Sequence, residues 1–145
     1  MYYRELSKIL SKEVLSVLGN NLSESIYRNA LCYELFMKNI PYNMEVVIPV
    51  MYKKHQVGYG RADIIIDNKL ILELKAVATK PGLNEKNQLI NYMKMTGITE
   101  GCIINFNKNK TEPDFLDVQI YNEPPPPLYI NYDPNKLITV TDFKL

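Results

Sequence analysis

The sequence predicts an α/β domain in which one β-sheet is covered by helices. Two short apolar runs, residues 64–66 and 70–74, lie on either side of a turn signal at Asp67-Asn68, which is typical of two buried strands joined in a hairpin. Apolar residues recur at helical spacing in three segments around this hairpin, which are residues 5–18, 21–38 and 84–95. A further buried strand, residues 101–106, follows the third helix. We therefore expect it to run parallel to a neighbouring strand through a right-handed crossover.

The chain has 145 residues, the usual size of a single domain, and 46% hydrophobic and 23% charged residues are ordinary for a soluble globular protein. We expect one domain over residues 1–145, with a core at about 5–107 and an extension at 108–145. No apolar run approaches the roughly 18 residues of a membrane span, so we expect no contact with a membrane. The formal net charge of +1 gives no long-range attraction to nucleic acid, so any such binding depends on local groups.

The first residues lack the basic start and apolar middle of a signal peptide, so we expect an intracellular protein. The location would be the cytoplasm, or the nucleus or a viral factory if the source is a eukaryote or a large DNA virus. Cys32 and Cys102 lie in apolar surroundings and are expected to be reduced core residues.

Two helices are expected before the first strand. The first covers residues 5–18, and the second begins near Asn21 or Ser23 and ends near Lys38. Asn21 and Glu24 have the spacing of a capping box, in which Glu24 would only return a hydrogen bond to the Asn21 backbone.

Turn signals mark the remaining elements. Residues 44–52 form a strand in which Pro49 indicates a sheet edge or a bulge, and residues 53–55 make a polar turn. Asn84 is expected to cap the third helix and Gly97 to end it. Beyond residue 107 we expect a strand at 115–121, an extended polyproline spacer at Pro124–Pro127 and an edge strand at 137–141.

Outside its turn, the predicted hairpin has three charged residues at positions expected to be buried, where a lone charge costs several kcal/mol. They are Asp63, Glu73 and Lys75. Such charges are tolerated when they are paired or when a bound cation neutralises them. The hairpin therefore contains either an ion-pair network or a metal site.

The length of the hairpin turn decides whether the two carboxylates can meet. If only Asp67 and Asn68 form the loop, Asp63 and Glu73 lie on opposite faces of the sheet. If Lys69 also belongs to the loop, with Asn68 or Lys69 in the left-handed conformation, Asp63 lies opposite Glu73 with Cβ atoms about 5 Å apart. Lys75 would then share their face, roughly 7 Å along the strand. A divalent cation between the carboxylates would remove their repulsion, so the metal interpretation predicts an odd-length turn or a bulge.

The order of these features resembles the PD-(D/E)XK nuclease superfamily, in particular the small proteins named for a GxxExxY motif and the RecB and phage-exonuclease branch. The matching segments are Asn21–Tyr27, Gly60–Asp63, Leu72–Ala76, Gln88–Tyr92 and Gly101–Phe106. Asn21 stands where the motif has glycine, a mild departure because asparagine also tolerates left-handed and capping conformations. The resemblance implies a restriction-endonuclease-like α/β core with a mixed central sheet flanked by helices.

The same resemblance implies phosphodiester hydrolysis that depends on Mg²⁺ or Mn²⁺. By this resemblance Glu24, Asp63 and Glu73 would bind the metal directly or through water, and Lys75 would orient or activate the attacking water. The backbone carbonyl of Leu74 is a further candidate ligand. Hard carboxylate oxygens suit these cations, which polarise a phosphate and lower the pKa of bound water.

Gln88 and Tyr92 are four residues apart and share a helix face, where they could hold the active-site lysine and carboxylate or contact the substrate backbone. Each candidate also has a purely structural interpretation. Glu24 would cap a helix, Gln88 and Tyr92 would be surface residues, Asp63 would pair with Arg61 or Lys75, and Glu73 and Lys75 would form the solvent-facing stripe of an edge strand.

We therefore expect a metal-dependent nuclease that acts on DNA rather than RNA, with little sequence preference because little chain remains to read base edges. The residues do not distinguish endonuclease from exonuclease, and an RNA-directed nuclease would use the same set. The alternative is a nuclease-like fold kept as a nucleic-acid-binding or protein-assembly module, with activity that is weak or depends on a partner. A homo-oligomer or a protein partner also stays open.

Overall fold

The computed structural model describes residues 2–121 of the chain. The predicted spacer at Pro124–Pro127 and the predicted strand at 137–141 lie outside these residues. The described elements, in chain order, are α1 (Tyr2–Leu18), α2 (Glu24–Met37), β1 (Tyr42–Tyr52), β2 (His55–Ile66), β3 (Leu70–Lys75), α3 (Leu83–Thr96), β4 (Glu100–Asn105) and β5 (Asp114–Gln119).

The five strands form one mixed sheet in the order β1-β2-β3-β4-β5. The pairs β1–β2, β2–β3 and β4–β5 are antiparallel, whereas β3 and β4 are parallel and are connected through α3. The predicted parallel pairing through a helix and the predicted mixed sheet are therefore confirmed, and the architecture is a restriction-endonuclease-like α/β fold. None of the helices within residues 2–121 is long and apolar enough to cross a membrane.

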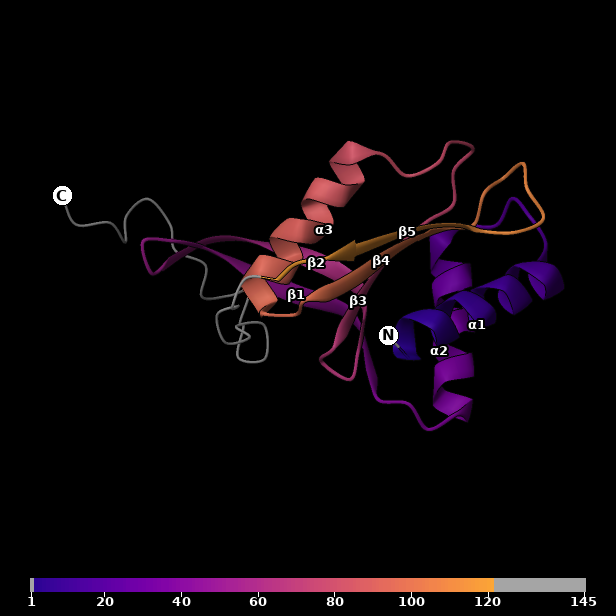
Figure 1. Ribbon diagram of the computed structural model, residues 1–145, viewed down its shortest axis with the longest axis horizontal. Coiled ribbons are helices and arrows are strands. Elements are labelled where there is room, and N and C mark those ends of the chain that lie inside the picture. The colour runs from indigo at the N-terminus through magenta and orange to yellow at the C-terminus, as the bar shows by residue number, and fades with distance from the viewer. Residues whose placement is uncertain (1, 122–145) are drawn as a thin grey trace.

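Helices cover both faces of the sheet (Figure 1). The helices α1 and α2 pack on one face, where Leu10, Leu31 and Leu35 meet the strand residues Ile64, Leu72 and Ile104. On the other face α3 packs with Leu89, Tyr92 and Met93 against Ile65, Ile71 and Ile103. Cys32 and Cys102 are buried and form no disulfide, as expected. Because β3 is covered on both faces, its charged residues lie within a largely apolar layer.

The turn between β2 and β3 contains three residues. Ile66 pairs with Leu70, and the Lys69 N–H donates to the Ile66 carbonyl at 2.9 Å. Asn68 adopts the expected left-handed conformation with φ 53°, and so does Asp67 with φ 50°. The prediction of an odd-length turn is confirmed, so the register places Asp63 opposite Glu73.

The strand β1 lies at the edge of the sheet and contains Pro49. Its register against β2 shifts between Val50 and Met51, so both the edge position and the bulge that the proline indicated are present. Lys53 and Lys54 form the turn at the end of this hairpin, each with positive φ. In Figure 1 the β1–β2 ribbon extends well beyond the helices.

The Asn21 capping box and the Asn84 cap are wrong, whereas the expected helix starts near Ser23 and Asn84 and the expected end at Gly97 are confirmed. The second helix begins at Glu24 with Ser23 at its N-cap, so Glu24 is the first helical residue and no capping box forms with Asn21, whose φ is 69°. The third helix begins after Gly82, whose N–H donates to the Glu85 carboxylate at 3.0 Å. Asn21 has a left-handed backbone, which does not suit an N-cap, and Asn84 already lies inside the third helix, so neither side chain occupies the cap position.

Candidate functional site

The strands β2 and β3 separate at Asp63 and Glu73. Their ladder runs from Ile66–Leu70 to Ile64–Leu72 and ends there. At the next position the Leu74 N–H donates to the Asp63 carboxylate oxygen Oδ2 at 2.6 Å. The side chain of Asp63 thus replaces a backbone acceptor, and the sheet opens at this point.

The opening coincides with a break in the side-chain alternation of β2. Ile64 packs with α1 and α2, whereas Ala62, two residues earlier, packs with α3. In β1, Glu45 lies between the residues that pair with Ile64 and Ala62, and its φ is 50°. Residues two apart in a strand normally point to the same face of the sheet. Ala62 and Ile64 point to opposite faces, so the alternation of side chains in β2 is broken at Asp63.

The Glu73 carboxylate lies in this opening and is largely buried. Its oxygen Oε1 is shielded from solvent and has no hydrogen-bond partner within residues 2–121. Burial, and then repulsion from the Asp63 carboxylate, raise the pKa of Glu73 to about 9, and the nearby charge of Lys75 offsets only part of this rise. A buried oxygen without a partner next to a second carboxylate is the arrangement expected of a cation site before the cation binds.

Lys75 is the last residue of β3 and is half-buried. It lies directly across the parallel ladder from Asn105. Its charge also reaches Glu85, near the start of α3. The pKa of Glu85 is lowered mainly by backbone N–H donors, with a smaller contribution from Lys75. Glu85 is therefore an acidic residue near the site that the sequence analysis missed. A glutamate three residues after Gly82 has the spacing of a helix N-terminus, and this spacing could have indicated it.

Glu24 is exposed at the start of α2, in the helical layer on the other face of the sheet from α3. One turn later, Arg28 forms an ion pair of 2.9 Å with Glu45. Within residues 2–121 no three His, Cys, Asp or Glu side chains are close enough together to hold a metal ion. The structure therefore brings Asp63 and Glu73 together without Glu24, whose role stays a prediction.

A comparison of the sequence with models of known protein families assigns the chain to a family. A family model for the PD-(D/E)XK nuclease superfamily matches residues 4–117. The chain belongs to this superfamily. Membership supports a nuclease, and superfamily members generally use divalent metals. The sequence matches no curated protein.

Two solved structures are similar to this PD-(D/E)XK chain. The crystal structure of SSO0001 has 22% sequence identity and a TM-score of 0.51, and the match covers 69% of this chain and 50% of that one. At that identity the likeness concerns the fold, and this chain spans only half the length of SSO0001. An alkaline exonuclease (LHK-Exo) from Laribacter hongkongensis has 9% identity and a TM-score of 0.38, with 83% of this chain and 81% of that chain covered.

Gln88 and Tyr92 connect α3 to β2 within the PD-(D/E)XK fold. The Gln88 amide donates to the Tyr92 hydroxyl at 3.0 Å, and the Arg61 N–H donates to the same hydroxyl at 3.3 Å. Gln88 is exposed, but Tyr92 is only 8% exposed and lies against Gly60. The interpretation of Tyr92 as a surface residue is therefore wrong, because its ring fills the space that Gly60 leaves. This contact holds α3 on β2, close to Asp63.

Tyr27, the tyrosine that matched the GxxExxY motif, is fully buried. Its hydroxyl donates to the Gly19 carbonyl at 2.6 Å and accepts from the Leu22 N–H at 3.3 Å. Its ring stacks on Phe106, with ring centroids 4.4 Å apart and an interplanar angle of 6°. These contacts join the α1–α2 connection to the end of β4, which gives Tyr27 a structural role.

Proposed function

We propose that this chain is a metal-dependent nuclease that hydrolyses the phosphodiester bonds of DNA with little sequence preference. The observation that carries the proposal is the Glu73 oxygen Oε1, which is buried and has no hydrogen-bond partner among residues 2–121, at the point where β2 and β3 separate, with Asp63 opposite it. A structural ion pair would have supplied a partner for this oxygen. A hard divalent cation is the partner that two opposed carboxylates favour.

The residues of the opening fit such a cation. Asp63, Glu73 and the Leu74 carbonyl would hold Mg²⁺ or Mn²⁺, and Glu24 would contribute through a water molecule. Because the N–H and C=O of one strand residue point to the same side, the N–H of Leu74 that reaches Asp63 supports a carbonyl facing the same opening. When bound, the cation would polarise the scissile phosphate and lower the pKa of a bound water molecule.

The remaining side chains would act on the substrate. Lys75, two residues after Glu73, brings a positive charge to the place where negative charge grows on the phosphate and would orient the attacking water. Gln88 is exposed beside the site and has an amide that can donate to a backbone phosphate, while Tyr92 holds its helix in place. Within residues 2–121 the helices and strands of the core account for most of the chain, so few residues remain that could contact base edges. This favours cleavage without sequence preference.

The test is cleavage of single-stranded and double-stranded DNA, and of RNA, with Mg²⁺, Mn²⁺ or EDTA. We expect cleavage of DNA that requires metal and falls at least about a hundredfold in Asp63→Asn and in Lys75→Ala. Glu13→Gln and Lys12→Ala, which change exposed residues of α1, are the matched controls and should retain activity. Cleavage that survives Asp63→Asn and Lys75→Ala would come from a contaminant and would refute the site. Faster cleavage of RNA than of DNA would overturn the substrate assignment.

A second candidate is a PD-(D/E)XK domain that binds nucleic acid or assembles with a partner and is weakly active alone. The formal net charge of +1 favours it, because the chain has little long-range attraction to a polyanion. Fluorescence anisotropy with labelled DNA separates the two. Binding without cleavage in any metal would support the second candidate, and metal-dependent turnover by the isolated chain would exclude it.

A further inference from the structure

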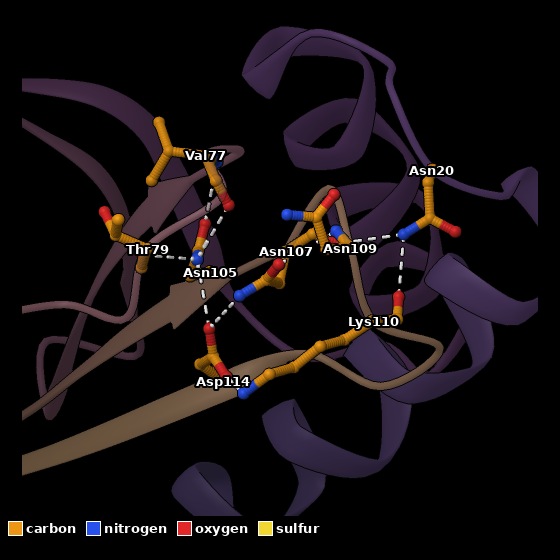
Figure 2. Close-up of polar contacts among 8 residues, drawn as sticks. All are labelled: Asn20, Val77, Thr79, Asn105, Asn107, Asn109, Lys110 and Asp114. Atoms are coloured by element: carbon orange, nitrogen blue, oxygen red, sulfur yellow. Dashed lines mark hydrogen bonds and ion pairs between the residues drawn. The ribbon is translucent and has the colours of Figure 1, made fainter.

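Asn105 is the last residue of β4, is fully buried and lies directly across from Lys75. Its side-chain amide reaches the segment that follows Lys75 (Figure 2). The oxygen Oδ1 accepts from the Val77 N–H at 3.0 Å. The nitrogen Nδ2 donates to the Val77 carbonyl at 3.1 Å and to the Thr79 carbonyl at 3.0 Å. We call these contacts of Asn105 with Val77 and Thr79 the asparagine clamp.

The clamp continues the sheet beyond its last backbone pair. The ladder between β3 and β4 ends at Lys75 and Asn105, where the Phe106 N–H donates to the Lys75 carbonyl at 2.8 Å. The Asn105 amide then bonds both the N–H and the C=O of Val77, as the backbone of a paired strand would. Lys75 is thus held between a regular ladder before it and a side-chain clamp after it, which restricts the backbone on both sides.

The chemistry of the clamp requires an amide. The nitrogen Nδ2 also donates to Asp114 Oδ2 at 3.1 Å, so it faces three oxygens while Oδ1 faces an N–H. A carboxylate at this position would set a negative charge against those three oxygens. Asp114 itself is fixed by the Asn107 amide at 2.7 Å and by the Lys110 ammonium at 2.8 Å, so the orientation of the Asn105 amide is determined from outside the clamp.

The same network extends toward Glu24. The Asn20 amide, in the connection between α1 and α2, donates to the carbonyls of Asn107 and Lys110, each at 2.7 Å (Figure 2). Asn20 lies four residues before Glu24. The end of β3 and the start of α2 are therefore tied to the same loop between β4 and β5.

We propose that Asn105 is a positioning residue for Lys75, and that the asparagine clamp fixes the lysine relative to the carboxylates of the opening. This inference rests on the proposed nuclease function. Without the clamp, the segment after Lys75 loses three hydrogen bonds and keeps the weaker one from the Lys108 N–H to the Val77 carbonyl at 3.3 Å. Small displacements of a catalytic group lower turnover strongly.

The experiment compares Asn105→Ala with Asn107→Ala. Both asparagines are at most 1% exposed and both donate to Asp114 Oδ2, but only the Asn105 side chain contacts Val77 and Thr79. Both substitutions should destabilise the protein, and Asn105→Ala should do so more strongly, because the Asn105 side chain makes four hydrogen bonds and the Asn107 side chain makes two. Only Asn105→Ala should lower kcat, by about tenfold to a hundredfold with KM little changed. Amide hydrogen exchange followed by mass spectrometry should show faster exchange across residues 76–82 in Asn105→Ala alone.

The outcomes separate this inference from the proposed function. If the wild-type chain cleaves DNA and the two variants have equal kcat and equal exchange at residues 76–82, Asn105 is only structural and the inference fails. If the wild-type chain cleaves nothing with any metal, the proposed function fails, and the assignment of Asn105 to catalysis fails with it. If Asn105→Ala does not fold, Asn105→Ser, which retains a hydroxyl at this position, carries the same comparison with Asn107→Ser.

Discussion

Gly60→Ala should destabilise the protein through one contact, that of β2 with Tyr92. A Cβ atom at residue 60 would lie 2.4 Å from Tyr92 Cε1, 2.8 Å from its hydroxyl oxygen and 2.9 Å from Cζ. Carbon atoms in contact prefer about 3.5–4.0 Å, so the ring must move by roughly 1 Å. It cannot swing into solvent without loss, because Tyr92 is packed with Leu89 and Met93 in the core beneath α3.

The cost has two parts. Overpacking of a filled core costs ~1–3 kcal/mol. Displacement of the ring also weakens the hydrogen bond from the Arg61 N–H to the Tyr92 hydroxyl, which contributes ~1 kcal/mol. We therefore expect the free energy of unfolding to fall by ~2–4 kcal/mol in urea titration. Asp63 lies three residues further along β2, so DNA cleavage should fall as well.

Gly58→Ala is the matched control, two residues away in the same strand. A Cβ atom there meets nothing within 4 Å. Alanine also restricts the unfolded chain, so we expect no loss of stability and a gain of up to ~0.5 kcal/mol. If the two variants differ by less than ~0.5 kcal/mol, the contact between Gly60 and Tyr92 does not hold α3 on β2 as described, and the reasoning is refuted.

Three further predictions concern the site and its surroundings. Burial and the Asp63 carboxylate raise the pKa of Glu73 to about 9, so the stability linked to Glu73 is complete below its usual value of 4.5 and is lost as the pH rises through 9. Glu73→Gln should therefore raise the free energy of unfolding near pH 8 in EDTA by ~1–3 kcal/mol and abolish stabilisation by Mg²⁺; an unchanged urea midpoint would contradict this. Burial opposes the charge of Asp114, but hydrogen bonds from Asn107, Lys110 and Asn105 outweigh it and lower the pKa, so the linked stability is present above 3.8 and is lost as the pH falls through the lowered value. Asp114→Asn should thus cost ~1–3 kcal/mol near pH 7 and progressively less in acid, and an equal loss at both ends of a pH series of thermal unfolding would argue against the network. Tyr27→Phe should cost ~1–2 kcal/mol with the cleavage rate retained, whereas Tyr33→Phe, at a tyrosine that is 60% exposed, should cost less than ~0.5 kcal/mol; a Tyr27→Phe variant of full stability that no longer cleaves would give Tyr27 a part in the chemistry.

The sequence could predict the features that depend on local pattern. The apolar runs around Asp67 and Asn68 indicated the hairpin, and the repulsion expected between Asp63 and Glu73 indicated the length of its turn. The order of helix and strand after Lys75 indicated the parallel pair. Each of these follows from periodicity or from the cost of burying charge, both of which are encoded within short segments.

The sequence could not predict contacts between residues that are far apart in the chain. Asn105 looked like an ordinary residue of a buried strand, because nothing near it in the chain shows that its amide will meet Val77 and Thr79. The break in alternation at Asp63 depends on the left-handed backbone of Glu45 in another strand, and the fit of Tyr92 over Gly60 depends on how α3 docks. The identity of the capping residues was also missed, since Ser23 and Gly82 occupy the N-cap positions where Asn21 and Asn84 were the expected side chains.

The asparagine clamp also has a consequence for the order in which the chain is made. Asp63, Glu73 and Lys75 are translated before Asn105 and Asp114, so a nascent chain carries its charged residues before it can fix them in place. We expect the site to be assembled only after the strands β4 and β5 have emerged and joined the sheet. A nuclease built in this way would stay inactive until the residues of the clamp have emerged from the ribosome. Arrested chains of increasing length, assayed for cleavage, should become active only when residues up to Gln119 are free to fold.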